Sequence, residues 1–404
     1  MTSTNNRVYY ASQVAQLRPC SDDGSLITDY WYTPIGLQSV GMTTNFNREQ
    51  TFQLGTVDIY DNIETVPEVE VTLNKIIDAS SPLYLMAMGG GGGIGAAKNA
   101  NIVSLSNNRV HFRLGIYDDN KQFAEGTAKS YVVCTGMYLS NFTYTLPVDG
   151  NATEQITLVG NSKKWNSTYD GVNSGGTNVV DTFTPGKKLA DNFTPSTSSG
   201  ILRRQYFNIQ GSVLPTGIGG IGGPGNGAKL PHLQNITFSA NLGRESINQL
   251  GKFGPYCRYA TFPVEVTSEF EIVAQDGDGL DFSDFRGEDF CGTSKTNIAY
   301  KTIKLSICDS VATSTANGLV FDLGTKNTLT AVNYAGGDTG GGNATVTYSF
   351  RNFNDFRIDA SGYYVKAVTV DDEGSSLSFQ AVKPVNTSVP AQTIDSYIGD
   401  INNG

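Results

Sequence analysis

Histidine and tryptophan are scarce in this 404-residue chain, which contains two of each. The two histidines, His111 and His232, leave little material for a Ser–His–Asp or Cys–His catalytic set. Five cysteines are scattered along the chain: Cys20, Cys134, Cys257, Cys291 and Cys308. They show no CxxC spacing, so we expect free thiols rather than a zinc site or a disulfide framework.

Long hydrophobic runs are also missing. The N-terminal stretch MTSTNNRVYY has no apolar segment of the kind that directs secretion. Nothing approaches the roughly 18 consecutive apolar residues that a membrane helix needs. We therefore expect no secretory signal, no membrane segment and synthesis in a reducing cytoplasm.

Charge is low and acidic. Charged residues make up 16% of the chain, and the formal net charge is −10, with −5 in residues 1–196 and −5 in residues 197–404. This even acidity argues against DNA binding by phosphate neutralisation. It suits a surface along which nucleic acid slides without sticking.

The chain is rich in residues that favour turns and strands. Glycine occurs 46 times, and aromatic residues make up 10% of the chain, alongside many Thr, Val and Tyr. This composition is typical of an all-β protein with many turns. The length is long enough for two or three domains with sizeable cores.

A segment of 31 residues occurs twice. Residues 37–67, LQSVGMTTNFNREQTFQLGTVDIYDNIETVP, return at a shift of 196 as LQNITFSANLGRESINQLGKFGPYCRYATFP, and 11 positions are identical without a gap. VEVT follows at residues 69–72 and 264–267, and NAT at residues 151–153 and 343–345. A period this long indicates a whole domain written twice rather than a solenoid of short repeats. Two unrelated β segments of similar composition would not hold one shift over 31 residues.

The duplication predicts four segments. We expect a first domain at 1–163, a linker or arm at 164–196, a second domain at 197–354 and a C-terminal extension with a possible hairpin at 355–404. Residues 43–60 are predicted to form a hairpin, and the alternating VEVTL a strand with one apolar face. The stretch SSPLYLMAM predicts a helix over 80–88, with Ser80 as its expected N-cap and a glycine run to stop it.

Three motifs contain residue types that can bind a cofactor, a cation or a partner. Gly90–Gly95 matches G-x-G-x-x-G, but no βαβ unit surrounds it, so we expect an accidental match and no cofactor. An acidic cluster has the density for a hard cation but not the EF-hand spacing, and a solvated loop is the simpler interpretation; its members are Asp276, Asp278, Asp281, Asp284, Glu288 and Asp289. Arg48–Glu49 and Arg244–Glu245 recur at equivalent positions, which indicates a structural or interface contact. We expect no enzyme activity, no catalytic residues and no metal site.

The chain resembles the major tail tube proteins of long-tailed bacteriophages, in the form with a duplicated tube domain. The resemblance rests on LQSV with FNREQTFQLG, on VEVTLNKIIDASSPLYLM, and on DLGTKNTLTAVNYAGGDTGGGNATVTYSFRNFNDF, and it covers roughly residues 5–163 and 200–354. Residues 274–293 depart from the helix segment of the first copy, so the two copies need not make the same lateral contacts.

This resemblance implies a mainly β fold: two tandem tail-tube-like β-sandwich or split-barrel domains, each with a short flanking helix, plus the C-terminal extension. It implies homotrimeric rings with pseudo-sixfold symmetry that stack into a hollow tube in the virion. DNA would pass from the capsid to the host without sequence-specific binding, and other tail proteins would bind the tube ends. The hairpin 131–159 and the segment 329–350 are the candidates for the lumen wall.

Two alternatives stay open. A different ring component of the virion, such as a tail tip, baseplate or capsid decoration protein, would share these domains. A carbohydrate-binding β-sandwich adhesin would instead use exposed aromatic side chains to stack on sugars, and the candidates are Trp31, Trp165, Tyr9 and Tyr10.

Overall fold

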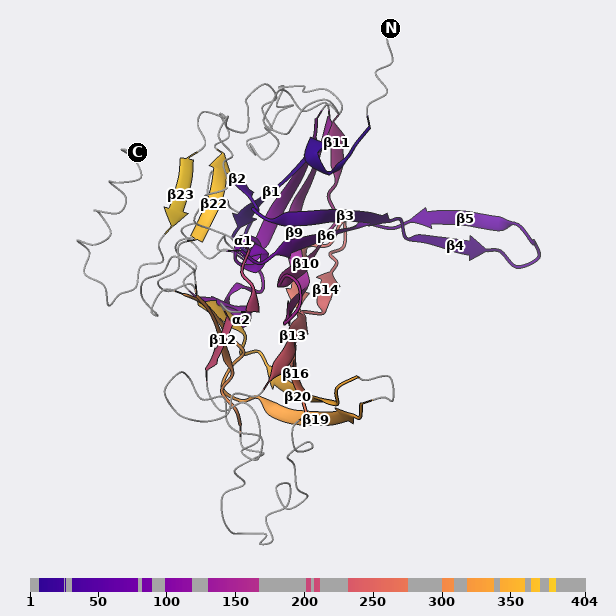
Figure 1. The fold of residues 1–404 in the computed structure, drawn as a ribbon. Helices are drawn as coiled ribbons and strands as arrows, with labels where there is room; N and C mark the ends of the chain where they lie inside the picture. The colour runs from indigo at the N-terminus through magenta and orange to yellow at the C-terminus, as the bar shows by residue number, and fades with distance from the viewer. Residues whose placement is uncertain are drawn as a thin grey trace.

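The computed structural model is mainly β and antiparallel, as the composition predicted (Figure 1). It describes residues 7–24, 26, 31–78, 82–88, 99–117, 130–166, 201–204, 207–210, 232–274, 300–308, 318–337, 342–359, 365–370 and 378–382. The glycine run at 89–93, the acidic cluster at 276–289 and most of the expected linker lie outside these residues.

The elements fall into two runs along the chain. The first run is β1 (Gln13–Cys20), β2 (Trp31–Thr33), β3 (Leu37–Asn45), β4 (Arg48–Phe52), β5 (Ile59–Glu64), β6 (Glu68–Ile76), α1 (Leu83–Met88), β7 (Asn99–Asn101), α2 (Ile102–Leu105), β8 (Arg109–Ile116), β9 (Ser130–Pro147), β10 (Thr153–Gly160) and β11 (Lys164–Asn166). The second run is β12 (Phe207–Gln210), β13 (Leu233–Asn241), β14 (Arg244–Ile247), β15 (Cys257–Ala260), β16 (Glu265–Val273), β17 (Lys304–Cys308), β18 (Gly318–Asp322), β19 (Thr328–Ala335), β20 (Thr345–Phe353), β21 (Arg357–Asp359), β22 (Val365–Val370) and β23 (Ser378–Val382).

An eight-stranded antiparallel sheet forms the centre of the molecule, in the order β3-β6-β10-β9-β13-β16-β20-β19. We call β3, β6, β10 and β9 the first sheet half, and β13, β16, β20 and β19 the second sheet half. The pairing of β9 with β13 joins the two halves edge to edge. Both halves therefore have the same strand order, read in the same direction.

The two sheet halves also share their irregularities. β3 skips Gln38 in its pairing with β6, and β13 skips Gln234 in its pairing with β16. Each glutamine donates its side-chain amide to the carbonyl oxygen two residues earlier, at 3.1 and 3.2 Å. β9 skips Ser140 opposite β10, and β19 skips Thr330 opposite β20. A bulge fixes register locally, so corresponding residues can be assigned across the halves.

One sequence alignment needs correction at this level. Thr44 pairs with Val69 in the first half, and Ala240, its counterpart at a shift of 196, pairs with Val266 in the second. Val69 therefore corresponds to Val266, not to Val264 as the VEVT match suggested. A two-residue slip keeps every side chain on its own face, so alternation in the sequence cannot reveal it.

A second layer covers one face of each half. The first part of β9 leaves the central sheet to pair with β8, which continues through β1 and β2, while β18, β17, β12 and β21 form a separate sheet with β7. The second run splits the equivalent of β9 into β18 and β19 at Gly324, whose φ is +95°. A Cβ there would lie 2.7 Å from the carbonyl oxygen of Asp355, so only glycine fits.

Among the described residues, a continuous apolar core lies between the layers and runs through both sheet halves. Aromatic rings meet at its centre: Tyr144 stacks on Phe238 with centroids 4.7 Å apart, and Phe142 stacks on Phe356 at 4.6 Å. Each pair combines one ring from the first run with one from the second. Burying such rings stabilises the two runs as one folded body.

The helix predicted over 80–88 appears as α1, with all six side chains buried. Ser80, its expected N-cap, lies outside the described residues. The backbone N–H groups of Leu83 and Tyr84 instead donate to the buried carboxylate of Glu154, at 2.7 and 2.8 Å, and the Tyr144 hydroxyl donates to the same group at 2.5 Å. Burial is the main cause that raises the pKa of Glu154. The short helix is thus tied to the sheet by a long-range contact.

Other expectations were partly right. The hairpin predicted at 43–60 is wrong in its limits, because β3 runs to Asn45 and the hairpin is β4–β5. Residues 164–166 of the expected linker form β11, which pairs with β9. In the extension, β22 and β23 form the expected antiparallel pair and continue the sheet beyond β2 (Figure 1).

Candidate assembly interface

The internal joint between β9 and β13 is built from seven consecutive residue pairs, from Asn235 opposite Pro147 to Asn241 opposite Asn141. On the core side, Phe142, Tyr144 and Leu146 face Ala240, Phe238 and Ile236, and all six side chains are buried. On the other side the side chains are small, and all except Pro147 are polar. The joint therefore combines a backbone ladder with an apolar seam on one face.

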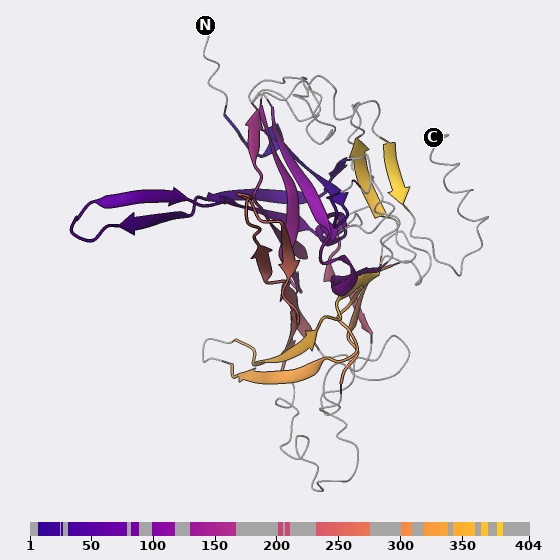
Figure 2. The same cartoon turned by 180° about the vertical axis from the view of Figure 1, so that it is seen from behind.

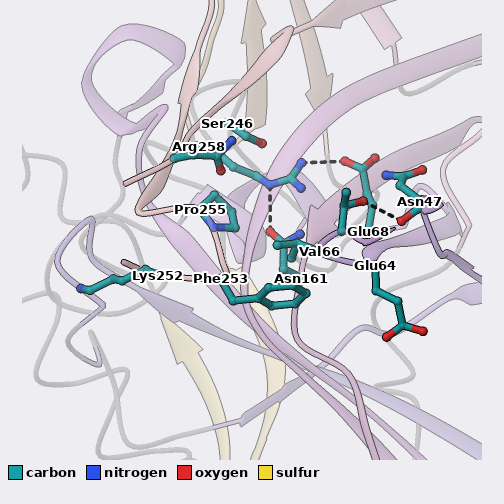
Figure 3. Close-up of a pocket in the computed structure, with 12 residues that line it drawn as sticks. Asn47, Glu64, Val66, Glu68, Asn161, Ser246, Lys252, Phe253, Pro255 and Arg258 are labelled. Atoms are coloured by element: carbon teal, nitrogen blue, oxygen red, sulfur yellow. Dashed lines mark hydrogen bonds and ion pairs between the residues drawn. The ribbon is translucent and has the colours of Figure 1, made fainter. Parts of the chain in front are cut away.

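The hairpin β14–β15 lies beyond the Asn241 end of this joint and contacts the first sheet half through Arg244 and Arg258 (Figure 3). The Arg258 guanidinium donates to the carboxylate of Glu68 at 2.7 Å and to the side-chain oxygen of Asn161 at 3.2 Å. Beside this network lies a cavity of about 500 Å³ between the loop that joins β14 to β15 and the base of the β4–β5 hairpin, which Phe253 and Glu64 help to line. The ion pair joins residues that are 190 positions apart in the chain.

Arg244 anchors the start of the same hairpin. Its Nε donates to the carbonyl oxygen of Leu139 at 2.7 Å, and its guanidinium lies 5.3 Å from the centre of the Tyr138 ring. Burial lowers the pKa of Arg244 to about 10, so the side chain stays charged at neutral pH. The arginine of the recurring Arg–Glu unit thus makes a structural contact with the first sheet half in this copy.

A small cluster behind the joint completes this contact. Tyr138, Val159 and Cys257 are buried together, with the tyrosine oxygen 3.3 Å from the cysteine sulfur. Burial, with this hydrogen bond as a second cause, raises the pKa of Tyr138 to about 12. The cluster lies outside the main core and holds β15 against β9 and β10.

Strands β3 and β19 are the two ends of the central sheet. Within the described part of the chain, β3 pairs with β6 alone and β19 with β20 alone. Neither LQSVGMTTN nor TLTAVNYA contains a charged residue or a proline, which are the usual devices against edge pairing. Val40, Met42 and Val332 are only partly buried on the core side. Both edges thus have the features of strands that pair with another chain.

The hairpin β4–β5 differs in environment from β14–β15. It projects from the body as a long arm, to the right in Figure 1 and to the left in Figure 2. We call residues 46–64 the arm. All of β5 is exposed, and Phe52 and Tyr60 are 65% and 70% exposed. Arg48 lies 3.3 Å from Glu64 across the base of the hairpin, in an exposed ion pair.

The face of the central sheet opposite the core is polar. Alternation along each strand places hydroxyl, amide and carboxylate side chains there. Its charged members are Glu68, Glu70, Glu265, Glu269, Glu271 and Arg351. The strands of the predicted lumen wall, β9 with β10 and β19 with β20, lie in this sheet, and carboxylates outnumber guanidinium groups on its polar face.

The residues considered for catalysis do not form a site among the described residues. His111 is buried in β8, where its Nδ1 accepts a hydrogen bond from the Gly136 N–H at 2.9 Å, and His232 is exposed at the start of β13. Burial, reinforced by Arg18 and Arg109, lowers the pKa of His111 to about 4. No group of three metal-ligating side chains occurs in the described ranges.

The structure removes Trp31 from the rings considered for sugar binding. Trp31 is buried, with the Arg113 guanidinium 4.1 Å from its ring centre, whereas Trp165 and Tyr10 are exposed. A buried indole offers no face to a sugar.

The interface residues that sequence reasoning missed are Tyr138, Arg258 and Cys257. Arg258 has Asn62 as its counterpart at a shift of 196, so the repeat did not single it out. Their contacts become visible only when the two runs are folded against each other.

No protein-family model matches the chain, and no curated protein matches it in sequence. Among the described residues, no helix is both long and apolar enough to span a membrane.

Proposed function

We propose that this chain is a structural subunit that closes into rings, and that the rings stack into the hollow tail tube of a bacteriophage. The observation that carries the proposal is the layout of the central sheet. The two strands that meet at the internal joint, β9 and β13, have counterparts in β19 and β3, which form the two outer edges. A chain with this layout pairs head to tail with further copies, and such pairing generates rings when the rotation closes.

The register of this pairing follows from the internal joint. Tyr144 faces Phe238 in the joint, and their counterparts are Tyr334 in β19 and Met42 in β3. We propose that Tyr334 of one chain faces Met42 of the next. Tyr334 is 52% exposed in the single chain, and this contact would cover its ring.

The proposed domain plan follows the sheet halves. Residues 1–163 and 197–354 are two copies of one tube domain, and three chains supply six sheet halves to each ring. The segments 164–196 and 355–404 begin with β11 and β21, which pair with β9 and β18. The other residues of these segments are candidates for contacts between chains or rings. The protein has no enzyme activity in this proposal and works in the virion after synthesis in the host cytoplasm.

The part of the polar face of the central sheet that neither β14–β15 nor the arm covers is the proposed lumen wall. Its carboxylates repel DNA phosphates at short range, and its hydroxyl and amide groups offer weak, exchangeable contacts to water. A genome would pass such a wall without the counterion release that drives binding to basic surfaces.

Imaging of the purified protein by negative-stain electron microscopy tests this function. Rings with six lobes that stack into tubes, and a mass of three chains per ring, are the expected result. Rings that never stack would favour a tail-tip, baseplate or decoration role. Discrete single chains under all concentrations and salt conditions would contradict the proposal.

A pair of variants tests the edge. Met42→Lys places a charge on the core side of β3, and we expect it to abolish rings because a buried lysine has no partner in the joint. Thr43→Lys, one residue along and on the polar face, is the matched control and should still form rings. Circular dichroism checks that both variants are folded.

A further inference from the structure

The arm and the hairpin β14–β15 correspond residue by residue but lie in different surroundings. Arg48 pairs with Glu64 in one hairpin and Arg244 with Ala260 in the other, at a constant shift of 196. β14–β15 is docked on the first sheet half, whereas the arm extends away from the body (Figure 1). The second sheet half has a surface equivalent to the one that receives β14–β15.

That equivalent surface can be located from the strand registers. Tyr138 faces Val159 next to the bulge at Ser140, and Thr328 faces Arg351 next to the bulge at Thr330. Cys257, which packs on Tyr138 and Val159, corresponds to Asp61 of the arm.

The residues at these three positions differ between the two copies in a way that keeps each hairpin chemically matched to one surface. A tyrosine, a valine and a cysteine that form a buried apolar cluster correspond to a threonine, an arginine and an aspartate. Asp61 is exposed on the arm, and Arg351 is about half exposed, 3.8 Å from the carboxylate of Glu265. Opposite charges on the two surfaces fit them to each other.

We infer that the arm of one chain docks on the second sheet half of another copy through an Asp61–Arg351 ion pair. The inference rests on the proposed ring, because it uses the pairing of β19 with β3 to bring the arm into position. Arg48 takes the place of Arg244 and donates to the carbonyl oxygen of Leu329, the counterpart of Leu139. The partner is therefore a second copy of this chain.

The charge pair also separates the two kinds of joint. An arm placed on the Tyr138–Val159 surface would bury the Asp61 carboxylate against Val159 in place of Arg351, so the carboxylate would lose this ion-pair partner, which is costly. β14–β15 placed on the second half would leave Arg351 facing a thiol. Each hairpin is thus matched to one surface, and this matching favours head-to-tail order over exchange of the hairpins.

Charge reversal tests the ion pair. Asp61→Arg and Arg351→Asp are each expected to weaken chain association roughly tenfold, because each places two like charges together in a desolvated contact. The double variant, which restores opposite charges, should recover most of the association. Asp58→Arg, which reverses a charge nearer the tip of the same arm, is the matched control and should leave association unchanged. Mass photometry over a concentration series measures the effect.

Normal association by both single variants, or no recovery in the double variant, would overturn the ion pair. A crosslinking experiment then separates the arm contact from the ring. Chains carrying Asp61→Cys are mixed with chains carrying Thr328→Cys under mild oxidation, because their counterparts Cys257 and Tyr138 touch. We expect a covalent dimer in the mixture and none with either chain alone. Ile63→Cys, whose counterpart Tyr259 is exposed, replaces Asp61→Cys in the control mixture.

The combined outcomes are distinct. Rings without the crosslink would overturn the arm contact and leave the proposed function standing. The crosslink in dimers that never form rings would support the arm contact and contradict the tube. Loss of both would overturn both.

Discussion

The internal joint and the outer edges of the central sheet are formed by corresponding strands, which are paired at the joint and unpaired on one side at the edges. At the joint, β9 and β13 are paired, Tyr144 and Phe238 are fully buried, and β14–β15 is docked. At the edges, β3 and β19 carry half-buried apolar side chains, and the arm is exposed. The docked hairpin thus lies beside a sheet half of its own chain, whereas the arm has no sheet half beside it in the single chain (Figure 1).

The two conditions also differ in chemistry. The joint has an aromatic seam and an apolar cluster, whereas the corresponding edge residues are Met42, Val332 and Tyr334, with the charged Asp61 and Arg351 behind them. An aromatic, dry contact suits a permanent connection within a chain. A smaller seam with an ion pair suits a contact that forms between separate molecules and responds to salt.

Removing the aromatic seam should have the largest effect. Phe238→Ala leaves a cavity beside Tyr144 and Phe321 and is expected to lower the free energy of unfolding by about 3–5 kcal/mol. Phe52→Ala, on the exposed arm, should change it by less than about 0.5 kcal/mol. Chemical denaturation of the two variants measures the contrast, and equal losses would contradict the assignment of the joint.

Lowering the pH should reduce the free energy of unfolding through His111 in the first run. Because the folded state holds the pKa of His111 near 4, below the unfolded value of 6.5, its contribution to stability is present above pH 6.5. That contribution is lost as the pH falls from 6.5 to 4, and it amounts to about 3 kcal/mol. His111→Gln should flatten the pH dependence of unfolding in this window, whereas His232→Gln, at an exposed position, should not. An unchanged slope in His111→Gln would refute the prediction.

The two corresponding arginines give a direct comparison. Arg244→Ala loses a charge-assisted hydrogen bond to the Leu139 carbonyl and should cost about 2 kcal/mol in the free energy of unfolding of the single chain. Arg48→Ala removes only an exposed ion pair and should cost less than about 0.5 kcal/mol there. In the assembled state Arg48→Ala should instead weaken association. Equal costs in the single chain would show that the arm is already docked.

Replacing the turn glycine should have the smallest effect on stability, and the effect should be equal in both hairpins. Gly55 and Gly251 adopt φ values of +94° and +82° at corresponding turns, with open space around each Cβ position. Alanine at either site is strained by its backbone conformation alone, so each variant should lose about 1 kcal/mol in thermal unfolding. A clear difference between the two would mean that surroundings, and not the turn, set the cost.

Part of the fold was predictable because it depends on local pattern. The alternation of VEVTL produced β6 with one buried face, and the shared run around Gln38 and Gln234 produced the same strand with the same bulge. The recurring Arg48–Glu49 and Arg244–Glu245 units pointed to a structural or interface contact, and Arg244 makes a structural one. The strand pattern involves residues that are neighbours in the sequence, whereas the Arg244 contact reaches Leu139 across 105 residues.

Contacts between residues far apart in the sequence could not be predicted, because local pattern carries no information about them. Glu154, 70 residues from Tyr84, caps α1, and Arg258 reaches Glu68 across 190 residues. Neither contact has a periodic or repeated signal, since their counterparts are Val346 and Asn62. The sequence alone determined the mainly β character and strands such as β6, because backbone propensity and alternation act over a few residues. Only the tertiary structure decided which hairpin is docked and which edge is open, because that depends on which sheet half lies beside it.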